Sequence, residues 1–582
     1  MNKLVLAETQ VNNPVRTLLA ALQAEFVVCP LEAIQTGERK GNTALILSEA
    51  QFVALCEAAS SRRSEFGELV SVFSDVLVYP FSGTAQAVSA LGRVVGAKIS
   101  VSPMSNGANS DYLVNGTREM CGPFVGVRVQ AVNSTQDAAL RFRDATSRID
   151  AIVTGGAGSL LARFELTSGL NLFVASSTAV FDCSAEHQRN LDVRENFSGL
   201  VPLLFFLRHC RINFPQSPFP WANWIIDDPN LTPRYGFLDI RELAESVRET
   251  RAAASIAFIP WNHTRTDKEV VGLFKQGWPQ LSICVHGCDH TVSEFSTRTV
   301  SAAMPLVDLA YRRMAQLERE TSLGFDRVMV FPQGEFSGEA MRALRASPML
   351  SAVNTELVDC QTGAGVKGHE LLRPAIMSFG GFPLFMRRRA EEASANFALD
   401  LLLGKPCLIV THHQFFEDGL KPLRAAVDRL NALQPDMVWT NLERGILSTY
   451  SVCSSPSRDS KVVRLYSACT TVQPQTDETI SFTRFETDPE VVEVFVNGTQ
   501  LPCGRFAGGI EFTVKGPGKE AMTVEARSSI REPSLQAIQS RKYRLKVSAR
   551  RYLSEVRDNY LCRFPRLTER AASVQQLLHR VR

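Results

Sequence analysis

The first 213 residues alternate short apolar runs with segments of helical periodicity. The runs are continuous and rich in Val, Ile and Leu, which is typical of strands buried on both faces of a parallel sheet. Helical patterns at residues 14–25 and 49–60 lie between such runs. The pattern predicts a parallel α/β sandwich domain over residues 1–213. Its expected strands are residues 4–7, 26–29, 44–47, 76–79, 98–101, 127–130, 151–153 and 172–175.

A second region, residues 221–450, shows the same rhythm more strongly and follows a proline-rich boundary, FPQSPFP at 214–220. Helical patterns separate most of its apolar runs, and seven or eight such strand–helix units fit a distorted (β/α) barrel. The expected helices are residues 240–252, 268–275, 300–320, 339–346, 396–403 and 423–433. The expected strands are residues 221–226, 255–259, 281–285, 328–331, 351–354, 372–376, 407–411 and 437–439.

The last part of the chain changes pattern after SSPSRDS at 454–460, which indicates a second linker. Short alternating runs follow between turn residues, and Asn497-Gly498 is a hairpin signal. They predict a small antiparallel β-sandwich over residues 461–530. Residues 531–582 favour helix and carry 13 Lys and Arg against 4 Asp and Glu. A solvated face or a docking surface fits this basic helical tail, and an anion-binding tail is the alternative.

Charge and composition narrow the class of protein. The net charge is +3, from 63 basic and 60 acidic residues, which gives no case for nucleic acid as a partner. The most apolar run, residues 200–207, is far too short to span a bilayer, so we expect no transmembrane segment. The N-terminus has no apolar stretch of signal-peptide length, and the 13 cysteines form no CxxC pair. We therefore expect a reducing, cytoplasmic location, and the sequence leaves the oligomeric state open.

Polar side chains follow two of the expected barrel strands at the point where each strand ends. Asp227 and Asp228 come directly after one apolar run, and His286 and His290 close another, in the stretch SICVHGCDH. The carboxyl ends of parallel strands gather at one face of a barrel, so we expect these side chains to lie together. Imidazole nitrogens and a carboxylate oxygen are the ligands of a catalytic divalent metal site that keeps a position open for water.

The paired aspartates offer two separate roles. Neighbouring residues at a strand end point to different sides, so one carboxylate can bind metal while the other acts as a general base. A further expected strand ends in His412-His413, and Pro332-Gln333-Gly334 follows another, where it could shape the rim of the pocket. All five Trp lie between 221 and 439, among them Trp224. Tryptophan there could stack on a sugar ring, although core packing is its more frequent use.

The order strand–Asp-Asp, strand–HxxxH, strand–PxG, strand–His resembles the NodB-homology polysaccharide deacetylases, carbohydrate esterase family 4, over roughly residues 221–445. The resemblance implies Asp227 as general base, with Asp228, His286 and His290 holding one divalent metal ion, zinc being the leading candidate. It implies His412 as the general acid, with His413 the runner-up, and places Trp224, Gln333 and His413 among the substrate-binding candidates. It also implies removal of an N-acetyl group from an amino sugar.

The chain departs from that family at three points. Gly287 stands where a Ser or Thr usually follows the first histidine, and Gln333 stands where an aromatic residue is usual. The third motif usually carries an arginine that steadies the base, but residues 330–334 hold none, and Arg373 is a possible substitute. Three functions stay open: hydrolysis of acylated amino sugars or polysaccharide, hydrolysis of a non-sugar amide on the same barrel, and glycan binding or assembly by a degenerate site.

The N-terminal layout loosely resembles flavodoxin-type and glutamine amidotransferase-like domains. TGGAG at 154–158 follows an expected strand, so we expect a tight strand-to-helix turn there, with an anion-binding helix start as the alternative. Cys183 lacks the glycine-flanked elbow that the amidotransferases use, so no nucleophile is evident. We expect a binding or scaffolding role for this part of the chain.

Overall fold

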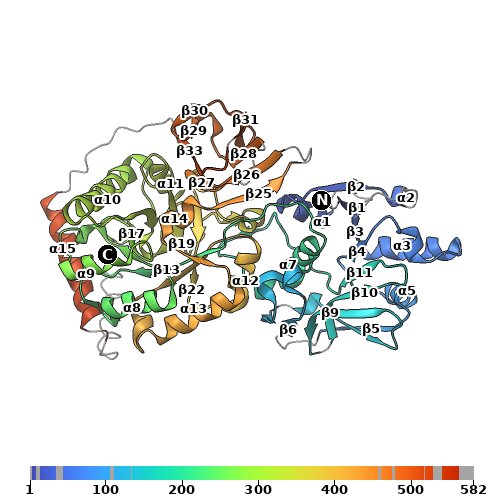
Figure 1. The fold of residues 1–582 in the computed structure, drawn as a ribbon. Coiled ribbons are helices and arrows are strands. Elements are labelled where there is room, and N and C mark those ends of the chain that lie inside the picture. Colours follow the sequence, from blue (N-terminus) through green and yellow to red (C-terminus); the bar gives the residue numbers. More distant parts are fainter. Residues whose placement is uncertain are drawn as a thin grey trace.

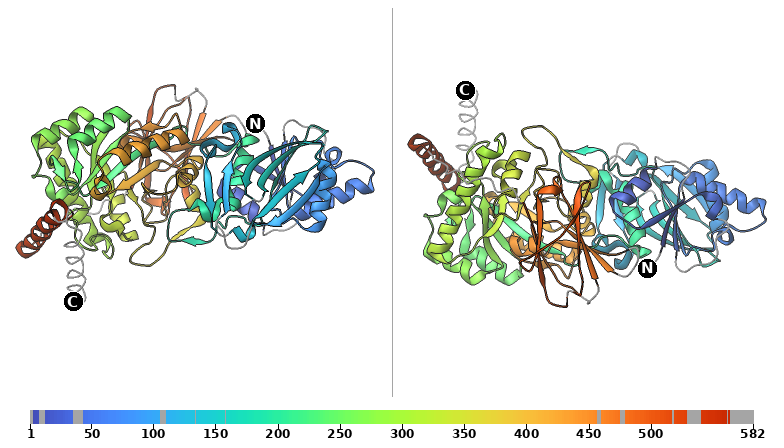
Figure 2. Two further views of the ribbon diagram at one scale, coloured as in Figure 1. Left: turned by 90° about the horizontal axis from the view of Figure 1, so that it is seen from below. Right: turned by 90° about the horizontal axis from the view of Figure 1, so that it is seen from above.

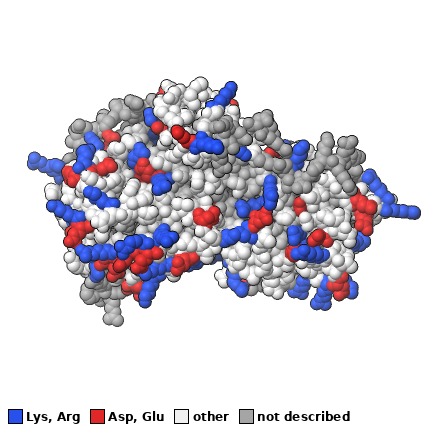
Figure 3. All heavy atoms as spheres, in the orientation of Figure 1, with Lys and Arg blue, Asp and Glu red and all other residues white. Residues whose placement is uncertain are grey.

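The structure is a computed structural model that describes residues 3–7, 13–34, 43–104, 110–132, 134–156, 158–455, 460–474, 479–516, 518–528, 540–560 and 562. The molecule is elongated (Figure 1), with an N-terminal sheet at one end, a parallel barrel at the other, and two small sheets beside the barrel. Lys and Arg are interspersed with Asp and Glu on the face drawn in Figure 3. Among the described residues, no helix is long and apolar enough to cross a membrane.

The first half of the N-terminal sheet is parallel. Its strands run in the order β2-β1-β3-β4-β11, and each neighbouring pair is parallel. Helices α1 and α7 pack on one face, and α3 and α5 on the other. The strands are β1 (Lys3–Ala7), β2 (Phe26–Cys29), β3 (Thr43–Leu47), β4 (Asp75–Val78) and β11 (Asn171–Ala175). The helices are α1 (Pro14–Ala21), α2 (Leu31–Ile34), α3 (Glu49–Ser61), α4 (Phe66–Leu69), α5 (Ala85–Val95), α6 (Arg118–Cys121) and α7 (Val193–His209).

The second half of this sheet is antiparallel, which corrects the all-parallel expectation. Beyond β11 the order continues β10-β9-β6-β7, while β8 pairs with β10 and β5 pairs with β8. β9 ends at Gly155 and β10 begins at Gly158, and the two strands are antiparallel neighbours in the same sheet, so the expected strand-to-helix turn at 154–158 is wrong. These strands are β5 (Lys98–Pro103), β6 (Ser110–Val114), β7 (Arg128–Ala131), β8 (Ala138–Arg143), β9 (Arg148–Gly155) and β10 (Gly158–Glu165).

The central sheet is parallel throughout and is nearly closed into a barrel. Its order is β21-β19-β18-β17-β16-β13-β23-β22, with β24 beside β13. The two edge strands, β21 and β22, are consecutive stretches of chain separated by Arg387 alone, so one segment joins both edges. The strands are β13 (Trp221–Asp227), β16 (Ala254–Phe258), β17 (Leu281–His286), β18 (Asp326–Val330), β19 (Ser351–Asn354), β21 (Leu384–Met386), β22 (Arg388–Arg389), β23 (Cys407–Thr411) and β24 (Val438–Trp439).

One expected barrel strand is wrong. Leu372 is the last residue of a 3-10 turn, η5 (Gly368–Leu372), residues 373–376 form no strand, and the sixth strand of the ring comes later, at β21 and β22. Amphipathic helices cover the outside of the barrel, and Asp239 and Asp267 cap two of them through backbone N–H groups. The helices are α8 (Ile240–Thr250), α9 (Lys268–Gly277), α10 (Val300–Thr321), α11 (Gly338–Arg345), α12 (Ser394–Leu402), α13 (Lys421–Leu433) and α14 (Leu442–Leu447).

Two sheets after the barrel enclose a separate apolar core that includes Phe482 and Phe512. Most of their strand pairs are antiparallel, but β26 and β28 are parallel. One sheet holds β25 (Tyr450–Ser454), β26 (Ser460–Leu465), β28 (Thr479–Phe485), β31 (Gly504–Phe506) and β32 (Gly509–Val514). The other holds β27 (Cys469–Val472), β29 (Val492–Val496), β30 (Thr499–Leu501) and β33 (Met522–Ser528).

The last described helix, α15 (Arg541–Asn559), does not stay with these two sheets. It lies at the far side of the barrel, next to α9 (Figure 1), and Figure 2 shows it there from above and below. The expected basic helical tail therefore contacts the barrel through this helix. The remainder of the expected tail, residues 531–539, 561 and 563–582, lies outside the described residues.

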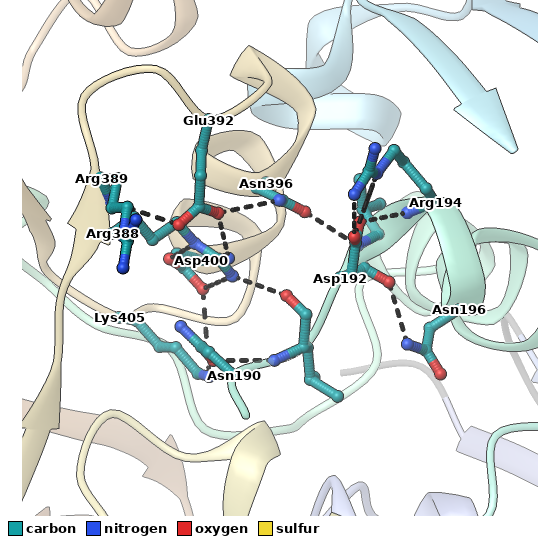
Figure 4. A network of polar contacts seen from close by, with 12 residues as sticks. Asn190, Asp192, Arg194, Asn196, Arg388, Arg389, Glu392, Asn396, Asp400 and Lys405 are labelled. Carbon is teal, nitrogen blue, oxygen red and sulfur yellow. Dashed lines mark hydrogen bonds and ion pairs between the residues drawn. The ribbon is translucent and has the colours of Figure 1, made fainter. Parts of the chain in front are cut away.

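A polar network joins the N-terminal region to the barrel (Figure 4). Arg388 is buried and pairs with Asp400 of α12, and its Nη2 donates to the carbonyl of Leu191. In return, the amide oxygen of Asn396 accepts from the backbone N–H of Val193 at 2.8 Å. A short strand pair, β12 (Glu186–His187) with β20 (Val366–Lys367), makes a second link. The N-terminal region thus braces the outside of the barrel at the segment that joins its two edges.

Candidate active site

A cavity of about 720 Å³ opens at the carboxyl ends of the barrel strands. The side chains predicted from the sequence to carry chemistry reach it from three strands. β13 ends at Asp227 and is followed by Asp228, β17 ends at His286, and β23 is followed by His412. Together with His290, all of them line this one cavity. The structure therefore brings together residues that lie up to 185 positions apart in the sequence, from 227 to 412.

Asp228, His286 and His290 form a compact donor set. Oδ1 of Asp228 lies 3.1 Å from Nε2 of His290 and 3.6 Å from Nε2 of His286, and the three donor atoms lie within 4.8 Å of one another. Nδ1–H of His286 donates to the carbonyl of Val330 at 3.0 Å, which leaves Nε2 as the free lone pair. Two imidazole nitrogens and one carboxylate oxygen, each turned to a common point, fit a divalent metal ion.

The loop that carries the two histidines is held by a buried carboxylate that sequence reasoning missed. Glu294 accepts hydrogen bonds from the backbone N–H groups of Cys288, Asp289 and His290, at 3.0, 2.8 and 3.3 Å. Burial raises the pKa of Glu294, while these N–H groups work to lower it. Gly287 has φ +63, and a Cβ there would overlap Pro332 and Glu294. The positive φ and this close approach together require glycine at position 287.

Cys288, Asp289 and Glu294 form a second group of metal-type side chains, close beneath the first. Their polar atoms already have partners: Nη1 of Arg313 lies 2.7 Å from Oδ1 of Asp289 and 3.4 Å from Sγ of Cys288. The hydroxyl of Tyr543 donates to the other oxygen of Asp289 at 3.1 Å. This group therefore shapes the histidine loop and leaves no open coordination position.

Asp227 is fixed by an arginine from the strand that closes the barrel. Arg387 donates from Nη1 and Nη2 to the two carboxylate oxygens, both at 2.7 Å, and both side chains are buried. Burial works to raise the pKa of Asp227, but Arg387, together with the charges of His286 and His412, outweighs it and holds the pKa below the usual range of aspartate. A carboxylate kept ionised and held in a fixed plane is suited to accept a proton.

Arg387, and not Arg373 as expected from the sequence, is the arginine that pairs with Asp227. Arg373 lies outside the cavity, with its guanidinium 5.4 Å from the ring centre of Phe485 in the C-terminal sheets. The expected substitute is therefore wrong, and its cause is the misplaced strand: the strand next to β23 runs through residue 387 and not through residue 373. The arginine triplet at 387–389, directly after an apolar run, was the available signal.

The two adjacent histidines have different surroundings. His412 stands at the cavity with 56% of its side chain exposed, and its Nε2 lies 4.0 Å from Oδ2 of Asp227. His413 is buried against Tyr235 and Phe237, with its Nε2 3.7 Å from Oδ1 of Asp558. Only His412 combines access to the cavity with closeness to Asp227, so its position favours His412 over His413 for proton transfer.

The other two substrate-binding candidates also differ. Gln333 lines the cavity with φ +60, and Asp228 and His290 likewise have positive φ, of 84° and 54°. Such backbone strain in non-glycine residues gathers at functional sites. Trp224 is 1% exposed, donates from Nε1 to the hydroxyl of Thr411 at 2.8 Å, and packs on Phe415. It belongs to the barrel core and does not line the cavity, which argues against the expected contact with substrate.

Helix α15 forms one wall of the cavity, and nothing in the sequence pattern placed it there. It contributes Arg550, Arg551, Ser554, Arg557 and Asp558 to the lining. Polar contacts fix it along its whole length. Tyr543 bonds Asp289, Glu555 accepts both Nη groups of Arg265 at 2.6 and 2.8 Å, and Asp558 accepts the hydroxyl of Tyr235 at 2.8 Å.

No family model matches the chain, and no curated protein matches it. Among solved structures, a novel carbohydrate deacetylase, Agd3, aligns with a TM-score of 0.46 and 8% identity over 90% of this chain and 99% of its own. A family 4 carbohydrate esterase from Streptomyces lividans in complex with acetate aligns with a TM-score of 0.24 and 11% identity over 38% of this chain and 90% of its own. A family 4 pseudoenzyme from Bacillus anthracis aligns with a TM-score of 0.23 and 9% identity over 38% of this chain and 63% of its own. These alignments are too loose to assign an activity.

Proposed function

We propose that this protein is a metal-dependent hydrolase that removes acyl groups from N-acylated amino sugars or polysaccharide. One observation carries the proposal: a three-donor set, an arginine-held carboxylate and an accessible histidine line a single cavity. Such a set provides a metal position, a general base and a general acid around one reacting amide. The amino sugar as substrate class comes from the order of motifs along residues 221–445.

Asp228, His286 and His290 would hold the metal ion. Burial works to raise the pKa of Asp228, but the two histidines hold it well below the usual range, so the carboxylate is ionised and ready to bind a cation. When bound, the ion would polarise the acyl carbonyl and lower the pKa of water. The hydrogen bond from Nδ1–H of His286 to Val330 keeps that ring turned with Nε2 toward the site.

Asp227 and His412 would move the protons. Asp227 takes a proton from the attacking water, and Arg387 keeps the carboxylate oriented while it does so. His412 lies next to Asp227 at the open side of the cavity, where it gives a proton to the leaving amine nitrogen. Both steps need a group within hydrogen-bond reach of the reacting atom, and Asp227 and His412 line the same cavity at 4.0 Å from each other.

A second candidate function is hydrolysis of a non-sugar amide by the same residues. The composition of the cavity lining favours it: of the described residues that line the cavity, Phe415 alone is a Phe, Tyr or Trp. Sugar-binding sites often contain an aromatic ring that stacks on the sugar. Trp224 cannot serve in this way because it is buried in the barrel core. A screen of acetylated amino-sugar oligomers against linear and cyclic amides separates the two classes.

Metal analysis tests the shared core of both. Wild-type protein should bind one divalent ion per chain, and Asp228→Ala should lose it together with the activity. Asp227→Asn should keep the metal and lose activity by roughly 100-fold or more, the usual size of a general-base contribution. Unchanged metal content in Asp228→Ala would end the proposal, and metal binding without any turnover would favour a degenerate binding site.

A further inference from the structure

We propose that helix α15 supplies a subsite in the catalytic cavity for an anionic group of the substrate, built on Arg551 and Arg550. The inference rests on the proposed function for the acylated part of that substrate, and it adds a negatively charged group near the acyl amide. The arginines come from the basic C-terminal stretch, which sequence reasoning could connect to an anion only as an alternative.

Arg551 carries the argument because it is a buried cation with unused donors. Its residue is 2% exposed, and neither Nε nor Nη2 has a hydrogen-bond partner. It lines the cavity together with Asp228 and His290. Leaving a buried charged donor unsatisfied costs free energy, since such groups are normally paired. Because Arg551 lines the candidate active site, an anionic ligand bound there can accept hydrogen bonds from these donors and offset that free-energy cost.

Arg550, the next residue, also lines the cavity and is partly buried. Burial and the neighbouring charge of Arg551 lower the pKa of Arg550. Two other cavity arginines are neutralised by direct partners, Arg387 by Asp227 and Arg557 by Asp558 at 2.6 Å. Among the described residues, no carboxylate lies within ion-pair distance of Arg550 or Arg551. Glu356 and Glu391 also line the cavity, but neither pairs with Arg550 or Arg551, so these two guanidinium groups are the cations of the α15 wall that have no direct ion-pair partner among the described residues.

The helix holds these side chains in place before a ligand arrives. Its first turn is tied to the histidine loop through Tyr543 and Asp289, at 3.1 Å. Its last turns are tied to the barrel through Glu555 with Arg265, and through Asn559, whose amide oxygen accepts from the backbone N–H of Gly236 at 2.7 Å. Because the wall is fixed, little ordering remains to be done when an anion binds.

The chemistry of the partner follows from the guanidinium group. Its planar fork matches a carboxylate or a phosphate and binds either through paired N–H donors. The arginines and the metal-type residues share one cavity of about 720 Å³, so the anion and the acyl amide belong to the same small substrate or to neighbouring units of a polymer. The substrate class is thus an acylated amino sugar that carries a carboxylate or phosphate.

Anion binding alone provides the first test, and it needs no turnover. Metal-free protein is titrated with inorganic phosphate at low ionic strength, and the affinity is measured by calorimetry. We expect saturable binding that falls about tenfold or more in Arg551→Gln, and falls clearly in Arg550→Ala. Arg544→Ala is the matched control, because Arg544 lies on the same helix, is exposed and does not line the cavity. Far-UV circular dichroism checks that each variant folds.

Turnover provides the second test and separates the two sources of charge. Rates are compared for N-acetylglucosamine, its 6-phosphate and N-acetylmuramic acid, which carries a carboxylate. We expect kcat/KM to favour at least one anionic sugar by about tenfold, and this preference to shrink at least as much in Arg551→Gln but not in Arg544→Ala. Equal phosphate binding by wild type and Arg551→Gln, or none by either, would overturn the subsite. Arg551-dependent phosphate binding without turnover of any acylated sugar would keep the subsite and overturn the proposed function.

Discussion

Two histidine–aspartate pairs, one against each large sheet, have almost the same geometry. Nε2 of His209 lies 3.2 Å from Oδ1 of Asp75 in the N-terminal sheet, and Nε2 of His290 lies 3.1 Å from Oδ1 of Asp228 in the barrel. Asp75 begins β4 and accepts further hydrogen bonds from Ser74 and Asn171. Asp228 follows the end of β13, lines the cavity, and has a second imidazole nitrogen, Nε2 of His286, 3.6 Å from its Oδ1.

The difference between the pairs is their surroundings, since the residue types and distances match. At the start of a strand, the Asp75 carboxylate is used up by protein donors, so the pair stabilises the fold. At the carboxyl end of a parallel strand, the loops leave space, and a third donor makes Asp228 and His290 part of a metal-type set. The end of the strand at which a histidine–aspartate pair lies thus decides whether the pair only stabilises the fold or is also free to bind a ligand.

The largest expected effect breaks one pair and not the other. His290→Ala should abolish metal binding and lower activity by about 1000-fold or more, because it removes one of three ligands. His209→Ala should keep the metal and cost about 1.5–3 kcal/mol of unfolding free energy, the usual contribution of a hydrogen bond to a charged group. Metal content by elemental analysis and denaturant unfolding measure both. Metal loss in both variants would mean that the comparison is wrong.

The second effect concerns adjacent arginines on the closing strand, of which one faces the cavity and one faces outward. Arg387→Ala leaves Asp227 buried and unpaired, so its pKa rises and the base holds its proton to higher pH. We expect the acidic limb of the kcat/KM profile to move upward in pH, with a loss of about 3–5 kcal/mol in stability.

Arg388→Ala is the matched control for that variant. It breaks a buried pair with Asp400 of similar geometry, so the stability loss should be of the same order. The residual folded protein should keep the wild-type pH profile, since Arg388 makes no contact with Asp227. The same shift of the acidic limb in both variants would show that the profile reports general destabilisation and not the pairing of the base.

The smallest effect separates the barrel core from the cavity rim. Trp224→Phe removes the hydrogen bond to Thr411, so it should cost about 1 kcal/mol of stability and leave KM unchanged. Gln333→Ala should instead raise KM and change stability little, because Gln333 lines the cavity. Steady-state kinetics with thermal unfolding distinguish them. A raised KM in Trp224→Phe would return this side chain to the substrate-binding set.

Local patterns predicted most of the barrel strands and brought Asp227, His286 and His412 to one cavity, because each of these residues ends or follows a strand that is visible as an apolar run. The runs before Asp227, His286 and His412 are all strands in the structure. The strand at 384–389 was missed because its second half is three arginines, which resemble a solvated face. That one error removed Arg387 from the expected site and put Arg373 in its place.

The N-terminal sheet was harder, because an apolar run indicates a buried strand but not its direction. The antiparallel strands β6, β8 and β10 were missed, and β10 directly follows the glycine-rich turn that suggested a helix. Long-range contacts were invisible for a different reason. The α15 arginines reach the site only through the tertiary fold, and no local periodicity marks where a distant helix packs. Glu294 is a different case: it lies only four to six residues from the N–H groups that it accepts, and no sequence motif marked that loop contact.

Arg387 lies between β21 and β22, so the segment that joins the two edges of the barrel also holds Asp227 in place. Residue 387 points inward to Asp227, while residue 388 points outward to Asp400 and to the Leu191 carbonyl of the N-terminal region. A fragment that holds the barrel alone would lose this support from the N-terminal region, and we expect β21 and β22 to separate from their neighbouring strands first. A stable barrel fragment of this protein is therefore expected to need residues 190–196 as well as the ring of strands.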